Sequence, residues 1–324
     1  MRHQLGSTAL DAVISRYLAH RRALGRQYSN QERTLHSMRD FVVRAGESDL
    51  NNTLFESWCK TFNSLTSNVR RARQVAVRNF CLYRQRTEPR CFVPDINRFA
   101  RPQPHAAPII LAPAQIGQLL ELADTREPRP TSPLRPHVLR LALVLLYTAG
   151  LRRSELLRLT LSDVDPQAGV LRIRESKFHR SRWVPLSSSA RKELRRYLVH
   201  RLSTPFDTTP SSPLLCNMHH GLRAYTGTGM RDGIVELLHE AGVCDINGRV
   251  PRIHDFRHSF AIESITRWYR QGVDVQSNLP KLALYMGHVS IVSTAYYLKW
   301  TPELKDLASK RFAKRFGYLV QGEK

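Results

Sequence analysis

A proline-rich stretch near one third of the way along the chain limits how the protein can fold. RFARPQPHAAPIILAP, residues 98–113, contains four prolines and little periodicity. Because proline locks φ and lacks an amide donor, such a stretch is typical of an extended linker. A chain of 324 residues is also long for a single domain. The sequence therefore predicts two domains, residues 1–100 and 113–301, joined by a linker at 101–112 and followed by an amphipathic tail at 302–324.

The first hundred residues have the pattern of a small helical bundle. Apolar side chains recur at helical spacing between Leu10 and Leu18 and again within residues 30–46. A third helix is expected to open with a capping box at Thr53–Glu56. A long fourth helix is expected to bury one apolar stripe, formed by Val69, Ala72, Ala76, Phe80 and Tyr83.

Positive charge dominates the composition. The chain has 50 Lys and Arg against 27 Asp and Glu, a net charge of +23. Such an excess favours a nucleic-acid partner, although a generally basic soluble protein or one on an acidic membrane surface has the same composition. Arginines on the fourth helix are either a solvated face or contacts to DNA phosphates. We take as candidates for phosphate contact Arg70, Arg71, Arg73 and Arg78.

The cysteines and the absence of long apolar runs indicate the cellular compartment. Five cysteines without a CxxC pair fit reduced thiols and predict no metal site. No signal peptide and no run of 18 apolar residues is visible, so we expect a cytoplasmic protein with no membrane partner. With DNA as the expected partner, we place it at the nucleoid of a prokaryotic cell.

The segment after the linker mixes helices with a small sheet. Pro113 suits the first turn of a helix that runs to about Ala123, and the apolar LRLALVLLYTAG predicts a buried helix ending at Gly150. Residues 169–186 depart from helical spacing and predict a β-hairpin. Further expected elements are a short strand at 214–216, a helix at 228–241, and helices from residue 254 onward. The predicted class is mainly α, with an α+β second domain that contains a small antiparallel β-sheet.

Four stretches of the second domain carry residues suited to phosphoryl transfer. They are GLRRSEL at 150–156, ESKFHRSRWVPL at 175–186, RIHDFRHSF at 252–260 and GHVSIVSTAYY at 287–297. Guanidinium groups match the charge that gathers on a phosphodiester in its transition state, and a tyrosine hydroxyl in cationic surroundings can form a covalent phosphoester. A lysine at a hairpin tip is a suitable general acid for a departing oxygen. This inventory needs neither a metal ion nor another cofactor.

These stretches, in this order, resemble the tyrosine recombinase (phage integrase) family over most of the chain. The resemblance implies a SAM-like helical core-binding domain before the linker and a catalytic domain after it. Carried over by position, the implied catalytic residues are Arg152, Lys177, His254, Arg257, His288 and Tyr297. Glu155 matches the acidic residue that braces the family's active site, or is an exposed helix carboxylate. Arg153 and Arg180 are further candidates for DNA contact.

The tyrosine is chosen by its distance from a histidine. The family's nucleophile stands nine residues after the histidine of the GH pair, so His288 selects Tyr297 rather than Tyr296. Two departures from the family pattern are visible. Lys299 stands where a histidine is frequent, and Tyr285 and Met286 replace the usual leucines.

The resemblance implies a site-specific DNA recombinase or integrase of a phage or other mobile element. Such an enzyme cuts and rejoins strands of double-stranded DNA recombination sites through a 3′-phosphotyrosyl intermediate, as a homo-tetramer on DNA and with possible co-acting recombinases or accessory proteins. The tail at 302–324 would then dock on a neighbouring subunit, or pack on its own domain. Alternatives are a type IB topoisomerase-like strand transferase, a hairpin-forming resolvase, or a catalytically silent DNA-binding partner of a recombinase set.

Overall fold

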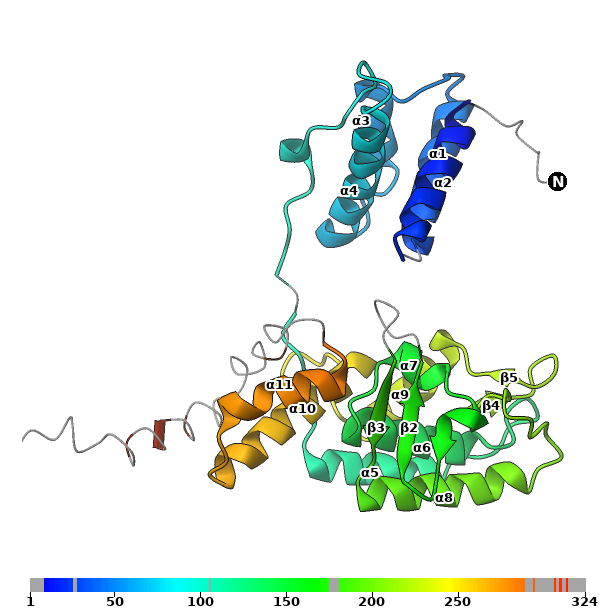
Figure 1. Ribbon diagram of the computed structural model, residues 1–324, viewed down its shortest axis with the longest axis vertical. Helices are drawn as coiled ribbons and strands as arrows, with labels where there is room; N and C mark the ends of the chain where they lie inside the picture. The colour runs from blue at the N-terminus through cyan, green and yellow to red at the C-terminus, as the bar shows by residue number, and fades with distance from the viewer. Residues whose placement is uncertain are drawn as a thin grey trace, which may run out of the picture. The chain divides into compact units, whose positions relative to one another are not determined.

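The computed structural model describes residues 9–25, 28–104, 106–174 and 181–288, together with positions 294, 306, 309, 310 and 313. The chain divides into two compact units between Ala106 and Ala107 (Figure 1). This division falls inside the stretch expected to be a linker.

The first unit is a helical bundle. Its helices are α1 (Ala9–Ala23), α2 (Ser29–Arg44), α3 (Asn52–Lys60) and α4 (Ser67–Arg84), followed by a 3₁₀ turn, η1 (Ile96–Arg98). Aromatic side chains fill much of its core: Tyr17 contacts Phe80 edge-on, and Trp58 contacts Phe62 in the same way. Their burial, with that of leucines from α1 and α2, holds the four helices together.

Helix α3 begins earlier than predicted. Its N-cap is Asn51, whose side-chain oxygen accepts a hydrogen bond of 2.9 Å from the Leu54 amide. The predicted capping box at Thr53–Glu56 was therefore wrong. Asparagine is among the strongest N-cap residues, and it stands two positions before the threonine.

The buried face of α4 also differs from the prediction. Val69 and Ala72 of the predicted stripe are exposed. The buried positions are Gln74, Ala76, Val77, Phe80, Cys81 and Arg84. Arg84 on this face is compensated by two carboxylates: its two Nη atoms bond Asp49 at 2.6 and 2.8 Å, and Nη2 bonds Glu88 at 2.5 Å.

The second unit surrounds one central helix. Its helices are α5 (Pro113–Asp124), α6 (Arg135–Thr148), α7 (Arg153–Leu157), α8 (Ser188–Leu202), α9 (Gly227–Glu240), α10 (Ile253–Arg270) and α11 (Val275–Met286), with a 3₁₀ turn, η2 (Leu161–Asp163). Helix α6 contacts α5, α8, α9 and α10. It is apolar nearly all round, as a helix covered on every side must be.

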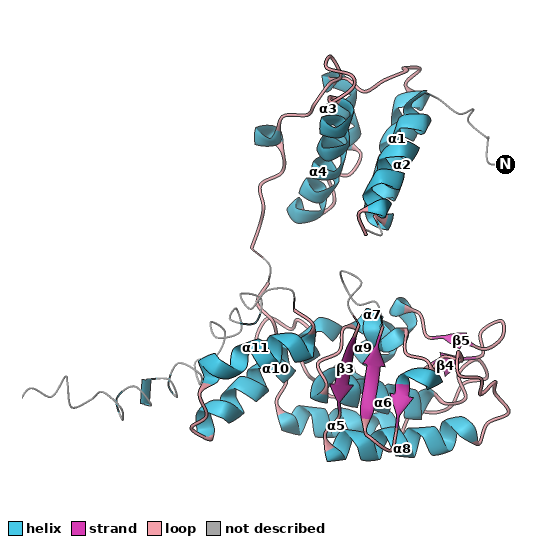
Figure 2. Ribbon diagram, viewed as in Figure 1, coloured by secondary structure: helices cyan, strands magenta, loops and turns pink. Residues whose placement is uncertain are grey.

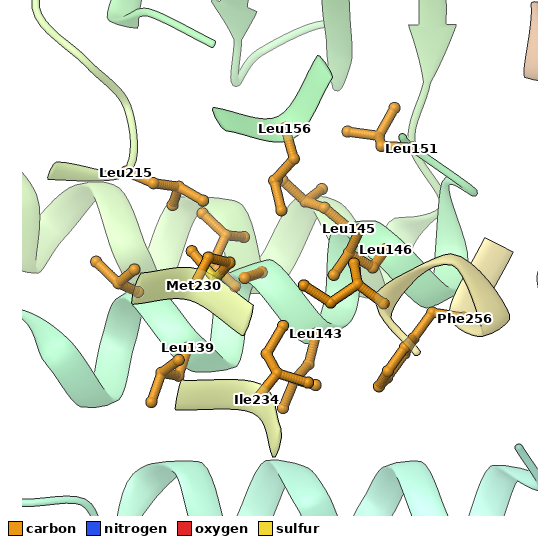
Figure 3. Close-up of a cluster of buried hydrophobic side chains, with 14 of the residues drawn as sticks. Leu139, Leu143, Leu145, Leu146, Leu151, Leu156, Leu215, Met230, Ile234 and Phe256 are labelled. Carbon is orange, nitrogen blue, oxygen red and sulfur yellow. The ribbon is translucent and has the colours of Figure 1, made fainter. Parts of the chain in front are cut away.

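Side chains from several elements meet on α6 (Figure 3). Leu139, Leu143, Leu145 and Leu146 come from α6 itself. Met230 and Ile234 of α9 and Phe256 of α10 pack in the same cluster. This core fixes the start of α10, which carries two of the predicted catalytic residues.

Two small antiparallel sheets complete the unit (Figure 2). The first has the order β1 (Val164–Asp165), β2 (Val170–Ile173), β3 (Arg182–Pro185), and the second pairs β4 (Cys216–Asn217) with β5 (Arg223–Ala224). Strands β2 and β3 are in register with Leu171 opposite Val184. The predicted hairpin is thus confirmed, whereas the strand predicted at 214–216 begins only at Cys216.

The prediction of a mainly helical chain with a small antiparallel sheet is confirmed. Among the helices that the structure describes, none has both the length and the apolar character needed to cross a membrane.

Candidate active site

The turn between α6 and α7 presents Arg152. Gly150 ends α6 with a φ of +58°, a left-handed conformation that favours glycine. Arg152 is the N-cap of α7, and its backbone amide donates to Oε2 of Glu155 at 2.9 Å. Local sequence therefore sets the place of Arg152: Gly150 ends one helix, and Glu155, three residues after Arg152, caps the start of the next.

Glu155 is buried and paired with two arginines. Its side chain is 1% exposed, and its Oε1 accepts from Arg152 Nη1 at 2.6 Å. Arg182 donates to both carboxylate oxygens at 3.0 Å. Burial raises the pKa of Glu155, but the hydrogen bonds and charges of Arg182 and Arg152 outweigh burial and lower the pKa to about 2. The alternative of an exposed helix carboxylate was wrong.

Both predicted catalytic arginines bond the turn at the end of α11. His254 and Arg257 lie in the first two turns of α10. Arg257 is 1% exposed and donates to the carbonyls of Gly150 at 2.5 Å and Met286 at 2.6 Å. Arg152 Nη2 donates to the Gly287 carbonyl at 2.8 Å. Residues far apart in the sequence are thereby brought to one place, directly before His288.

His288 is held at this turn by its backbone and its ring. Its amide donates to the Ala283 carbonyl at 2.8 Å, and its Nδ1 lies 2.7 Å from the Thr294 hydroxyl. Burial lowers the pKa of His288 to about 3, helped by the charges of Arg257 and Arg152. Histidine 288 is therefore neutral at pH 7.

His254 is also held neutral. Burial lowers its pKa, and Arg257 and Arg152 lower it further against the opposing effect of Asp255. The His258 ring meets that of His254 edge-on, with the ring centres 4.7 Å apart. Burial and this neighbour lower the pKa of His258 to about 4.

A cleft of about 650 Å³ opens beside Arg152 and His254. Its walls come from α7, α9 and the start of α10, and the side chains that line it include Arg152, Arg153, Arg231, His239, Arg252 and His254. A cleft lined by side chains of one charge concentrates ligands of the opposite charge. The arrangement suits a polyanion such as a nucleic-acid backbone.

The structure brings together Arg152, Glu155, His254, Arg257 and His288. Lys177, Arg180, Tyr296 and Tyr297 lie outside the described residues, as does most of the tail at 302–324. In the described part of the chain, no three His, Cys, Asp or Glu side chains gather as metal ligands do.

Sequence reasoning missed Arg182. It lies in the first position of β3, two residues before the buried Val184 and so on the same face of the strand. An arginine on the core-facing side of a predicted strand is a signal of a buried ion pair, and it was available in the sequence.

Three of the four candidate arginines of α4 have side-chain contacts within their own unit. Arg71 Nη1 donates to the Ala100 carbonyl at 3.2 Å, and Arg78 donates to the Pro94 carbonyl. The Arg73 guanidinium lies 5.1 Å from the centre of the Phe62 ring. Arg70 is half-buried. The contacts of Arg71, Arg73 and Arg78 fix the orientation of their side chains on α4.

Comparison with known proteins identifies the family. Residues 110–303 match the model of the phage integrase family. The integrase/recombinase y4rE of Sinorhizobium fredii (strain NBRC 101917 / NGR234) is 31% identical over 303 residues, which cover 93% of this chain and 95% of the relative. The chain belongs to the phage integrase family. It is a site-specific tyrosine recombinase.

Two further comparisons illustrate the range of likeness. Tyrosine recombinase XerC of Staphylococcus carnosus (strain TM300) is 30% identical over 159 residues, 49% of this chain and 48% of the relative. The solved structure of the Tn1549 transposon integrase in complex with a circular intermediate DNA has a TM-score of 0.64. That likeness covers 94% of this chain and 100% of the other at 17% identity, so it concerns the fold.

Proposed function

We propose that this recombinase cuts and rejoins DNA at specific sites of a phage or other mobile element through a 3′-phosphotyrosyl intermediate, without a metal ion or ATP. The observation that carries the proposal is the meeting of Arg152, Arg257 and His288 at the turn that ends α11. A role on a mobile element is inferred from the family and from the relative named integrase/recombinase.

The reaction exchanges one phosphoester for another. The Tyr297 oxygen bonds to phosphorus while the bond from phosphorus to the 5′-oxygen breaks. Lys177 gives a proton to the departing 5′-oxygen, and the tyrosine proton passes towards His254. Because the lowered pKa keeps His254 neutral, its imidazole is able to accept a proton at pH 7. Attack by a 5′-hydroxyl reverses each step and rejoins the strand.

The arginines stabilise the charge of the transition state. Arg152 lines the basic cleft with a side chain that is 20% exposed, and its two Nη atoms already bond Glu155 and Gly287. A guanidinium has five N–H donors, which leaves donors for phosphate oxygens. Arg257 bonds the same turn, so its charge acts on the same phosphate.

His288 adds a neutral hydrogen-bond donor. If the Thr294 hydroxyl donates to Nδ1, the proton of the ring is on Nε2. That Nε2–H then donates to a non-bridging phosphate oxygen. The lowered pKa supports this neutral form.

The proposed partner is double-stranded DNA, bound by a homo-tetramer with possible co-acting recombinases or accessory proteins. Residues 1–100 are the proposed core-binding domain, residues 113–301 the catalytic domain, and residues 302–324 the tail that docks on another subunit. Charge supports the choice of partner: the chain carries a net +23, and arginines line the cleft. Proposed phosphate contacts are Arg70, Arg71, Arg73, Arg78, Arg153 and Arg180.

Trapping the covalent intermediate tests the proposal. The protein is incubated with duplex DNA from the ends of its own element, nicked near the cleavage point so that rejoining is prevented, and the adduct is isolated in SDS. We expect an adduct on the peptide that contains Tyr297, formed equally well in EDTA.

The matched variants are Tyr297→Phe and Tyr296→Phe, each of which removes one hydroxyl. The first should lose the adduct and keep DNA binding, while the second should keep both. An adduct in Tyr297→Phe would exclude this nucleophile. Tight binding without any adduct in the unaltered protein would favour a silent DNA-binding partner.

A further inference from the structure

Arg182 is the residue that connects the parts of the site. It is the first residue of β3, and its side chain is 9% exposed. Its two Nη atoms donate to the two oxygens of Glu155, each at 3.0 Å. Its Nε donates to the Tyr285 carbonyl at 2.8 Å. One guanidinium therefore bonds α7 and the last turn of α11 from a third element, the sheet.

Both partners of Arg182, Glu155 and Tyr285, are themselves connected to residues of the proposed reaction. Glu155 bonds both the backbone amide and the guanidinium of Arg152. Tyr285 lies three residues before His288, on the same turn that bonds Arg152 and Arg257. Arg182 itself bonds neither of those arginines in the described contacts, so any effect on them passes through Glu155 and the turn.

The packing at Gly287 shows how close Arg182 lies to this turn. A Cβ added at Gly287 would come within 2.8 Å of Arg182 Nη1. Gly287 has a φ of +68°, which also favours glycine. The turn and the guanidinium are therefore closely packed. A shorter or differently shaped side chain at position 182 would remove the hydrogen bond to the Tyr285 carbonyl and this packing.

The charges add a second argument. Glu155 carries one negative charge between the positive charges of Arg152 and Arg182. The three groups together carry +1, which is available to a phosphate. Without Arg182, the carboxylate would pair with Arg152 alone, and that pair would be neutral. The transition state of the phosphodiester carries extra negative charge, and a neutral pair stabilises that charge less than a positive group does.

We propose that Arg182 is a positioning residue for strand cleavage: it holds Glu155 and the α11 turn so that Arg152 and His288 meet the scissile phosphate in the reactive geometry. The inference rests on the proposed function and adds a residue to it. Buried bonds of this kind matter because an active site requires its groups to be held within a fraction of an ångström.

The test measures cleavage separately from binding and folding. The full-length protein, in excess and at saturating concentration, reacts once with the nicked duplex, and the rate of covalent adduct formation is recorded with the Kd for DNA and the Tm. Arg182→Met should slow adduct formation by about 100-fold, the effect typical of a misplaced catalytic group. Its Kd should stay within about threefold, because phosphate contacts elsewhere provide most of the affinity.

Arg182→Lys separates the effect of the positive charge at position 182 from the effect of the guanidinium hydrogen bonds. A lysine restores the positive charge but is a point charge that cannot bond both carboxylate oxygens and the carbonyl as a guanidinium does. The rate should therefore lie between those of Arg182→Met and the unaltered protein. This variant keeps a positive partner for the buried carboxylate of Glu155. It can therefore replace Arg182→Met in the test if Arg182→Met does not fold.

A double variant tests whether Arg182 acts through Glu155. If it does, Arg182→Met and Glu155→Gln affect one network, and the double variant should cleave about as slowly as the slower single variant. Losses that simply multiply would overturn the proposed route through Glu155.

Arg140→Met is the control for the loss of a partly buried ion pair. Arg140 bonds both carboxylate oxygens of Glu193 at 2.8 Å and the Leu120 carbonyl at 3.2 Å, away from the candidate site. This variant should lower Tm and leave the cleavage rate unchanged. A cleavage rate in Arg182→Met equal to that of the unaltered protein would refute the inference, as would a loss no larger than that of Arg140→Met. Absence of adduct in the unaltered protein would instead refute the proposed function.

Discussion

The buried carboxylate of Glu155 is the residue on which the geometry of the site depends most directly. A carboxylate with 1% exposure is stable only if its charge is compensated, and three N–H bonds from side chains of two arginines do this. The same bonds hold the guanidinium of Arg152. The charge compensation of Glu155 and the position of the Arg152 guanidinium therefore depend on one ion-pair network.

Replacing Glu155 by Gln should lower the free energy of unfolding by about 3 kcal/mol at pH 7, because the two arginines lose their common partner. The folded pKa of Glu155 is about 2, below its ordinary 4.5. Its contribution is therefore complete above about pH 5 and is lost as the pH falls from 4.5 towards 2.

Urea unfolding of the unaltered protein and Glu155→Gln at pH 7 and pH 3.5 measures this contribution. The difference between the two proteins should shrink by roughly 1 kcal/mol at the lower pH. A difference that stayed constant or grew would contradict the lowered pKa.

Among the elements, the joint between α6 and α7 determines where Arg152 lies. Gly150 turns the chain there, and its carbonyl accepts from Arg257. The joint is also tightly packed, since a Cβ at Gly150 would come within 2.4 Å of Phe260 Cδ1. Backbone conformation and packing therefore both require glycine at this position.

Gly150→Ala should destabilise the protein much more than Gly242→Ala. Both glycines have a left-handed φ, +58° and +63°, but a Cβ at Gly242 meets no atom within 4 Å. We expect Gly242→Ala to lower the unfolding free energy by about 1 kcal/mol through backbone strain alone. Gly150→Ala should lower it by about 2 kcal/mol more through the clash.

Urea unfolding of the two glycine variants, with adduct formation as a second readout, checks this difference. Only Gly150→Ala should also slow cleavage, because only that joint carries Arg152. Equal loss of stability in the two variants would mean that Phe260 moves aside without a penalty.

Over the whole molecule, charge determines how the chain meets its partner. The net charge of +23 is spread over 50 basic residues, and several of the arginines described here are already bonded within their own unit. A guanidinium has five N–H donors, so a side chain with one or two internal bonds keeps donors that can bond a phosphate.

Binding to duplex DNA should weaken steeply with salt. A protein that contacts six to ten phosphates loses about 10³- to 10⁵-fold in affinity between 50 and 200 mM salt. We expect a loss in this range for both a duplex with the recombination site and a duplex of unrelated sequence, measured by fluorescence anisotropy. An affinity for either duplex that did not change with salt would argue against a phosphate-based interface.

The sequence by itself determined the features that depend on neighbours along the chain. The spacing of His254 and Arg257 places both on one helical turn, and the alternation of residues 169–186 produces a hairpin. Glycine at 150 and glutamate at 155 set the turn that presents Arg152. These are local preferences, and they act within a few residues.

Only the tertiary structure decided which distant groups became partners. Arg182 and Glu155 lie 27 residues apart and meet because β3, α7 and α11 pack together. Arg84 lies on the buried face of α4 and bonds Asp49, which is 35 residues away in the sequence. The physical reason is the same in both cases: a buried charge needs a partner, and only the packed chain determines which partner is within reach.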